Sequence, residues 1–153
     1  MNTVLLIAML LFLASDRSCP RPKDKDDAQA VLQQSAAAVL TAETLCKEYD
    51  DHVVAADQKY SGEVIEVCGK ITSIGIHNAS PVMTLRGHAF WGEWVVSCVF
   101  IKSSTSKIAA LKKNELVKVK DLVSKHRGYG IVSLKQCLLV EALGFTQRCI
   151  ERL

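Results

Sequence analysis

The chain has 153 residues, of which 49% are hydrophobic and 23% charged, and its formal net charge is +3. This composition is typical of a globular protein, and the length suits one domain, which sets aside a large multidomain assembly. The charge is uneven: residues 60–140 hold eleven basic and five acidic residues, whereas residues 1–59 hold six basic and nine acidic. A segment with this excess of cations could attract a polyanion, or its lysines could simply keep a solvated surface soluble.

The N-terminus has the pattern of an export signal. Val4–Ala14 is an uninterrupted apolar run of eleven residues, long enough for a signal peptide and too short for a bilayer, which needs about 20 residues. We therefore predict a signal peptide over residues 1–15 and an extracytoplasmic protein, periplasmic or secreted. Lipid anchoring on Cys19 is a weaker alternative, because Asp16 stands where a lipobox needs its cysteine. A buried N-terminal helix would also explain the apolar run.

A polar linker and a helical extension follow. Residues 16–27 contain four basic residues, four acidic residues and two prolines, which cannot bury a core. The alanine-rich residues 28–59 predict a helical extension that begins with a helix over Ala28–Leu45. Thr41 is a candidate N-cap for a second helical stretch, and Asp50 or Asp51 for a short third one.

Residues 60–140 predict a barrel. Alternating apolar and polar residues predict five strands, over 63–74, 82–86, 94–101, 116–123 and 131–140. An amphipathic helix is predicted between the third and fourth strands, over 103–113. This order is typical of the OB-fold, a mainly β, five-stranded Greek-key barrel. Residues 141–153 are predicted to form a C-terminal tail.

The six cysteines lack the spacing of a metal site, since no two are separated by two to four residues. We therefore predict no metal and no cofactor. An even number of cysteines in an exported protein permits disulfides. In an OB barrel Cys98 and Cys137 lie on neighbouring strands, and they could form a disulfide if their Cα atoms come within about 7 Å. The alternative is that both are buried free thiols.

Four short segments resemble a known family: Ala56–Gly62, Val67–Ile71, Val96–Phe100 and Leu134–Cys137. Together they resemble the tRNA-anticodon-binding-like OB-fold family. The resemblance implies a small exported or lipid-anchored bacterial protein, in a family named for its likeness to nucleic-acid-binding domains. The family pattern expects glycine on the fourth strand where this chain has Asp121. Because an inward carboxylate without partners is costly, we expect a local bulge that turns Asp121 outward.

The candidate binding residues follow from how OB-folds bind, through the second and third strands and the loops beside them. Aromatic side chains that stack bases, next to cations that follow phosphates, form a single-strand binding surface. On this chain the candidates are Arg86, Phe90, Trp91, Trp94, Lys125, His126, Arg127 and Tyr129. The alternative is that the aromatic residues close one end of the barrel as core and the basic loop is only solvated.

Catalytic motifs are not evident in the sequence. The four histidines lack metal spacing, and no serine lies in a nucleophile-elbow motif. We therefore predict a non-enzymatic, exported binding module that acts through a protein or cell-envelope partner. The alternative is a protein that binds single-stranded nucleic acid or oligosaccharide through the basic and aromatic loops. An enzyme is the second alternative and would need a pocket with converging titratable groups.

Overall fold

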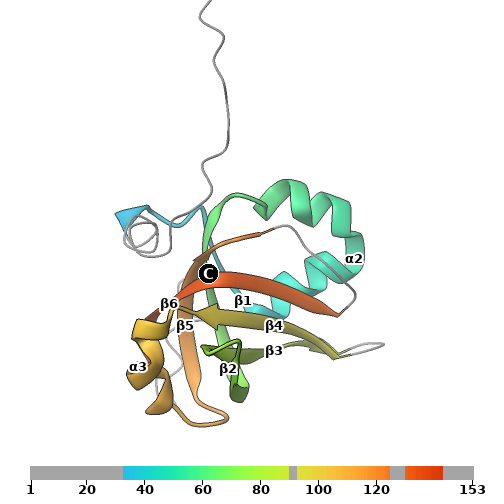
Figure 1. Ribbon diagram of the computed structural model, residues 1–153. Helices are drawn as coiled ribbons and strands as arrows, with labels where there is room; N and C mark the ends of the chain where they lie inside the picture. Colours follow the sequence, from blue (N-terminus) through green and yellow to red (C-terminus); the bar gives the residue numbers. More distant parts are fainter. Residues whose placement is uncertain (1–32, 90–92, 125–129, 143–153) are drawn as a thin grey trace, which may run out of the picture.

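A computed structural model describes residues 33–89, 93–124 and 130–142 and shows a small β-barrel with helices at its ends (Figure 1). The elements in chain order are β1 (Ala38–Thr41), α2 (Ala42–Tyr60), β2 (Val64–His77), β3 (Ser80–Ala89), β4 (Glu93–Phe100), the 3-10 turn η1 (Lys102–Ser104), α3 (Thr105–Ala109), β5 (Leu116–Leu122) and β6 (Ile131–Ala142). The predicted signal peptide, the linker and the tail beyond Ala142 lie outside the described residues.

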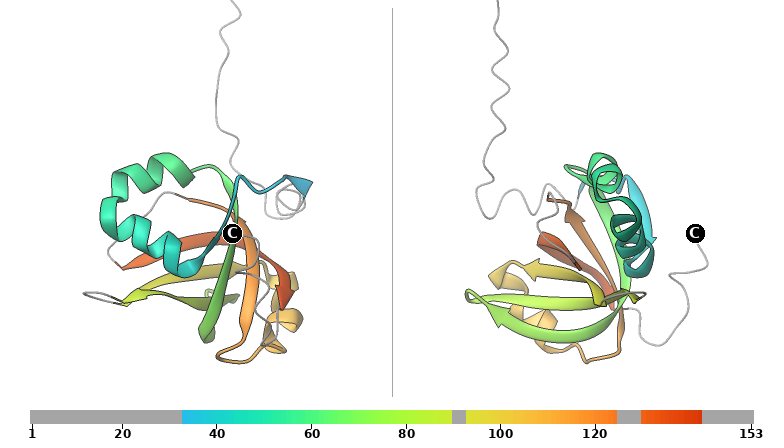
Figure 2. Two further views of the ribbon diagram at one scale, coloured as in Figure 1. Left: turned by 180° about the vertical axis from the view of Figure 1, so that it is seen from behind. Right: turned by 90° about the vertical axis from the view of Figure 1, so that its right-hand side faces the viewer.

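Five strands close into a ring because β2 is long enough to serve two neighbours. Its first half, residues 64–70, pairs antiparallel with β5, and its second half, from Ile71 to His77, pairs antiparallel with β3. The ring continues through an antiparallel β3–β4 pair, a parallel β4–β6 pair and an antiparallel β5–β6 pair (Figure 2). This arrangement confirms the predicted OB-fold, including the order of its strands and the position of the helix between β4 and β5.

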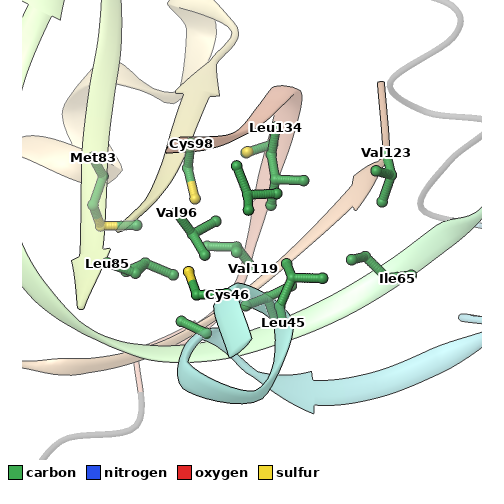
Figure 3. Packing of buried hydrophobic residues seen from close by; sticks show 14 of the residues in the cluster. Leu45, Cys46, Ile65, Met83, Leu85, Val96, Cys98, Val119, Val123 and Leu134 are labelled. Carbon is green, nitrogen blue, oxygen red and sulfur yellow. The ribbon is translucent and has the colours of Figure 1, made fainter. Parts of the chain in front are cut away.

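The core lies inside the ring, where alternate strand residues are fully buried. Met83 and Leu85 of β3, Val96 of β4 and Val119 of β5 meet Leu45 of α2 in one apolar cluster (Figure 3). Removing this apolar surface from water is the main force that holds the barrel together.

The short helix α3 packs against this core through Ile108, which is 1% exposed. The predicted helix over 103–113 is thus confirmed in place but is shorter, since α3 ends at Ala109.

The segment before α2 differs from the prediction. We predicted a helix over Ala28–Leu45, but Ala38–Thr41 forms β1, which pairs parallel with Ile65–Cys68 of β2. The first half of β2 pairs with β5 along one edge, while β3 pairs with the other edge only from Ile71 onward. The remaining backbone N–H and C=O groups of that edge are therefore free to pair with β1. The amide of Ala37 adds a bond of 2.8 Å to the carbonyl of Val64. Tertiary pairing therefore overrides the helix propensity of this alanine-rich stretch.

Helix α2 begins where the sequence predicted a cap. The hydroxyl of Thr41 accepts a hydrogen bond of 3.1 Å from the amide of Thr44, which confirms Thr41 as an N-cap. The helix then kinks at His52, whose φ of −162° and ψ of 87° are not helical. His52 Nδ1 accepts a bond of 3.2 Å from the amide of Ala55, so the imidazole caps the second half of α2. The predicted break at Asp50 or Asp51 is therefore displaced by one or two residues.

Side chains hold the two halves of α2 in a fixed bend. The hydroxyl of Tyr49 donates to Asp57 over 3.1 Å, and the hydroxyl of Tyr60 donates to Glu48 over 2.9 Å. Lys59 adds an ion pair with Glu48 at 2.8 Å. Within the described part of the chain, no helix is both long enough and apolar enough to cross a membrane.

Candidate nucleic-acid or protein interface

The outward side chains of β3, β4 and β6 form a continuous surface, which we call the outer face. Its residues alternate with buried core residues along each strand, so they point away from the interior of the barrel. They are Val82, Thr84 and Arg86 on β3, Val95, Ser97 and Val99 on β4, and Ile131, Ser133 and Lys135 on β6. None of these positions carries an acidic residue; Glu93 begins β4, but its side chain lies outside the described part of the chain.

The strand register arranges the outer face in rows. Thr84 pairs with Ser97, and Ser97 pairs with Ser133, which places three hydroxyls across three strands. Neighbouring strands lie about 4.7–4.9 Å apart, so these hydroxyls can contact one extended ligand. We call Thr84, Ser97 and Ser133 the hydroxyl row.

Apolar side chains and two cations border the hydroxyl row. On one side Arg86 pairs with Val95, and Val95 pairs with Ile131. On the other side Val82 pairs with Val99. Since β3 runs opposite to β6, the exposed cations Arg86 and Lys135 lie at opposite corners of the outer face.

The turn between β2 and β3 lies at one end of the outer face. Asn78 and Ala79 have φ values of 49° and 61°, as a two-residue type I′ hairpin turn requires. His77 and Asn78 are exposed there, with Asn78 Nδ2 3.2 Å from His77 Nε2. The connections from β3 to β4 and from β5 to β6 include residues 90–92 and 125–129, which lie outside the described residues.

The structure places two of the predicted binding residues. Arg86 is exposed on the outer face, as the prediction requires. Trp94 is 9% exposed and belongs to the core cluster, which fits the alternative that this aromatic residue closes one end of the barrel as core. On β4 it shares the inward side with Val96 and Cys98, because side chains alternate along a strand. The other predicted residues, Phe90, Trp91, Lys125, His126, Arg127 and Tyr129, lie outside the described residues.

Asp121 also differs from the prediction, because it points inward and is fully buried. Its Oδ1 accepts hydrogen bonds from the amides of Leu122 (2.7 Å) and Gln136 (3.2 Å). The Cys137 thiol lies 3.4 Å from its Oδ2. These donors compensate a carboxylate that we had expected to turn outward. Burial nevertheless dominates and raises the pKa of Asp121 to about 6.

Of the two possibilities for Cys98 and Cys137, the structure shows buried free thiols and no disulfide between them, and neither residue has exposed surface. Burial, followed by a hydrogen bond with Cys98, raises the pKa of Cys137 well above its usual value. Burial likewise raises the pKa of Cys46 to about 12. A thiol must ionise to attack a disulfide, so the raised pKa values of Cys46 and Cys137 keep these two thiols unreactive.

Sequence reasoning missed the hydroxyl row and Lys135. The strand alternation alone would have marked Thr84, Ser97 and Ser133 as outward. Their side-by-side arrangement depends on the register between strands that are far apart in the sequence, and composition carries no sign of it.

Comparison with known proteins supports the fold. The chain is similar to a protein from Klebsiella pneumoniae described as a "putative nucleic acid-binding lipoprotein", with 19% sequence identity, a TM-score of 0.56 and coverage of 79% of this chain and 100% of that one. It is also similar to asparaginyl-tRNA synthetase from Pyrococcus horikoshii, with 16% identity, a TM-score of 0.40 and coverage of 56% of this chain and 21% of the synthetase. No curated protein matches. The tRNA_anti-like family matches residues 2–138, and the chain therefore belongs to that family.

Proposed function

We propose that this protein is a non-enzymatic, exported OB-fold binding module that recognises a protein or cell-envelope partner through the outer face. The observation that carries the proposal is the hydroxyl row, three neighbouring hydroxyls on three rigid strands. Strands hold side chains more precisely than loops do, which favours a defined binding geometry. The OB-fold commonly binds through the equivalent strands.

The chemistry of the outer face suits a protein partner. The hydroxyl row both donates and accepts hydrogen bonds, while Val82, Val95 and Val99 offer apolar area beside it. The core of a protein interface has few charges, and here the charges are at opposite corners. An extended strand or a loop of a partner could therefore lie along the hydroxyl row.

Three observations support an extracytoplasmic location. The apolar run Val4–Ala14 suits a signal peptide. Cys68 is disulfide-bonded, and disulfides persist in oxidising compartments. The similar Klebsiella protein is described as a lipoprotein. We propose a periplasmic or secreted protein, with a lipid on Cys19 as the alternative form.

Site-specific photo-crosslinking tests the outer face as the partner site. A photoreactive residue at Ser97, in the centre of the hydroxyl row, should form a covalent adduct in cells that produce the protein. The matched control carries the same residue at Val54, which is 62% exposed on α2 and far from the hydroxyl row in sequence. An adduct that forms at position 97, is absent at position 54 and survives nuclease treatment supports the proposal. Equal adducts at both positions, or none at 97, would rule it out.

Single-stranded nucleic acid is the second candidate ligand, because Arg86 and Lys135 border the hydroxyl row and residues 60–140 carry an excess of cations. The Klebsiella protein's description points the same way. If this ligand is correct, the Ser97 adduct is destroyed by nuclease.

Salt-dependent binding of a short oligothymidine tests this candidate further. Replacing both Arg86→Gln and Lys135→Gln should weaken binding, and each lost phosphate contact should reduce the slope of log affinity against log salt by about 0.7. Lys47→Gln removes one positive charge from α2, away from the outer face, and should leave the slope unchanged. Binding that does not depend on salt, or a slope that stays the same in the double variant, would exclude nucleic acid at the outer face.

A further inference from the structure

Two isoleucines in the hairpin of β2 and β3 are exposed to solvent. Ile76 is 77% exposed and Ile74 is 37% exposed. Ile74 pairs with Met83, and Ile76 pairs with Pro81. Directly paired residues lie on the same face of a sheet, and Met83 belongs to the core. The two isoleucines therefore continue the inward face of the barrel beyond the core and present apolar surface to solvent.

Two lysines near this hairpin follow strand β4. Val82 of β3 pairs with Val99 on one side and, on the other, with the residue before Ile76. The end of β4 therefore lies level with Ile76, two strands and about 10 Å away. Lys102 begins η1 just after β4, and Lys107 lies on α3. Both η1 and α3 contact β3, so these lysines lie at the end of the barrel from which the hairpin extends.

Two further lysines lie at the base of the hairpin. Strand β2 pairs with β5 only as far as Lys70, and the loop before β5 then bonds to the next residue of β2. There the amide of Asn114 donates to the carbonyl of Ile71 over 2.8 Å. Lys112 and Lys113 come directly before Asn114. Like the two lysines that follow β4, they are exposed.

The charge of this end of the barrel is of one sign along the chain. Residues 67–92 and 94–114 contain no aspartate or glutamate. Glu115 follows, and its carboxylate accepts a hydrogen bond of 3.0 Å from the amide of Lys112. The hairpin and α3 therefore combine exposed aliphatic side chains with an excess of positive charge. We call this set of residues the end surface: Ile74, Ile76, Lys102, Lys107, Lys112 and Lys113.

We propose that the end surface binds an anionic lipid bilayer. Binding to a bilayer surface grows with the apolar area that enters the boundary between headgroups and acyl chains, and with the attraction between cations and anionic headgroups. The two isoleucines supply the first contribution and the four lysines the second. A single-stranded nucleic acid fits this surface less well, because its bases stack on aromatic rings and the exposed apolar side chains here are aliphatic. The proposal goes beyond the binding function of the outer face and does not depend on it.

Flotation with unilamellar vesicles tests the proposal. The protein should bind vesicles of equal parts phosphatidylglycerol and phosphatidylcholine, and should bind phosphatidylcholine alone only weakly. Ile76→Ser should weaken binding to the mixed vesicles about ten-fold, because the apolar side chain no longer enters the bilayer. Lys107→Gln should weaken it about five-fold. Any contribution of the apolar run Val4–Ala14 is common to all these proteins and does not affect the comparison.

Helix α2 provides the matched controls, because it lies on the opposite side of the barrel from α3 (Figures 1 and 2). Val54→Ser removes an apolar side chain that is 62% exposed, and Lys47→Gln removes one exposed positive charge. Both should leave binding to the vesicles unchanged. If the protein does not bind the mixed vesicles, or if the control variants lose as much affinity as Ile76→Ser and Lys107→Gln, the proposal is wrong.

Fluorescence quenching distinguishes insertion from adsorption by charge alone. The tryptophan of Ile76→Trp should be quenched by mixed vesicles whose acyl chains carry bromine, whereas Val54→Trp should be quenched no more than the unmodified protein. Equal quenching at the two positions would refute insertion of the hairpin. A crosslink from a photoreactive residue at position 76 to another protein, together with no binding to the vesicles, would assign the end surface to a protein partner and overturn the proposal.

Discussion

Replacing Asp121→Asn should make the protein more stable at pH 7.5 and remove part of the pH dependence of its stability. The asparagine Oδ1 can accept from the amides of Leu122 and Gln136, as the carboxylate Oδ1 does in the structure. Its side-chain amide can donate to the sulfur of Cys137. The variant therefore keeps the hydrogen bonds to Oδ1, loses the bond of 3.3 Å that Oδ2 accepts from the Gln136 amide, and carries no buried charge at neutral pH.

The direction of the pH effect follows from the raised pKa of Asp121. The pKa is about 6 in the folded protein, against an ordinary value of 3.8. Between these values the folded state binds more protons than the unfolded state, so the free energy of unfolding falls as the pH rises through this window. A shift of this size corresponds to about 3 kcal/mol. The stability advantage of Asp121→Asn should therefore increase by about that amount from pH 3.5 to pH 7.5.

Urea denaturation of both proteins at several pH values measures this difference. Other ionisable groups, such as Glu48 with its lowered pKa, contribute equally to both proteins and cancel. Asp50→Asn is the matched control, because Asp50 is exposed on α2. Asp121→Ala removes the acceptor as well, and should be less stable than Asp121→Asn by about 1–3 kcal/mol for each buried amide left without a partner. If the free energies of unfolding of the unmodified protein and of Asp121→Asn differ by the same amount at every pH, the effect of burial on the pKa of Asp121 is contradicted.

Replacing Gly87→Ala should destabilise the protein by about 3 kcal/mol or more, because α2 packs directly on this glycine. A Cβ atom at Gly87 would lie 2.3 Å from the Sγ of Cys46 and 2.4 Å from the carbonyl oxygen of Trp94. The cysteine side chain has little room in the core, and the Trp94 carbonyl belongs to the backbone of β4. Helix α2 and the β3–β4 pair must therefore separate to admit the methyl group. Thermal or urea denaturation measures the loss.

Gly75 on the same sheet is the matched control. A Cβ atom there would have no neighbour within 4 Å, so Gly75→Ala should change stability little. Adding Cys46→Ala to Gly87→Ala removes the closest contact but leaves the Trp94 carbonyl, so the rescue should be partial. Equal stability of Gly87→Ala and Gly75→Ala would show that α2 does not pack on β3 as the structure describes.

The barrel itself was predictable because its signals are local. Alternation of apolar and polar residues marked all five barrel strands, and Ile108 marked the helix between the third and fourth. The N-cap at Thr41 was equally local, since a capping hydroxyl needs only an amide three residues later. Such features depend on neighbours within a few residues, so the sequence contains them.

Pairings between distant segments decided the features that the sequence did not predict, such as β1 and the inward position of Asp121. Ala38–Thr41 has alanine-rich, helix-favouring surroundings, yet it is a strand because half of β2 offers a free edge. Asp121 points inward because Gln136 and Cys137, from another strand, add donors to the one that Leu122 of its own strand supplies.

The same distinction applies to the candidate site. The sequence alone determined the strands, the unequal charge and the exposed position of Arg86. Only the tertiary structure brought Thr84, Ser97 and Ser133 into one row and turned Trp94 into the core. The physical reason is that register between strands is set by how the whole barrel closes, and no short segment records it.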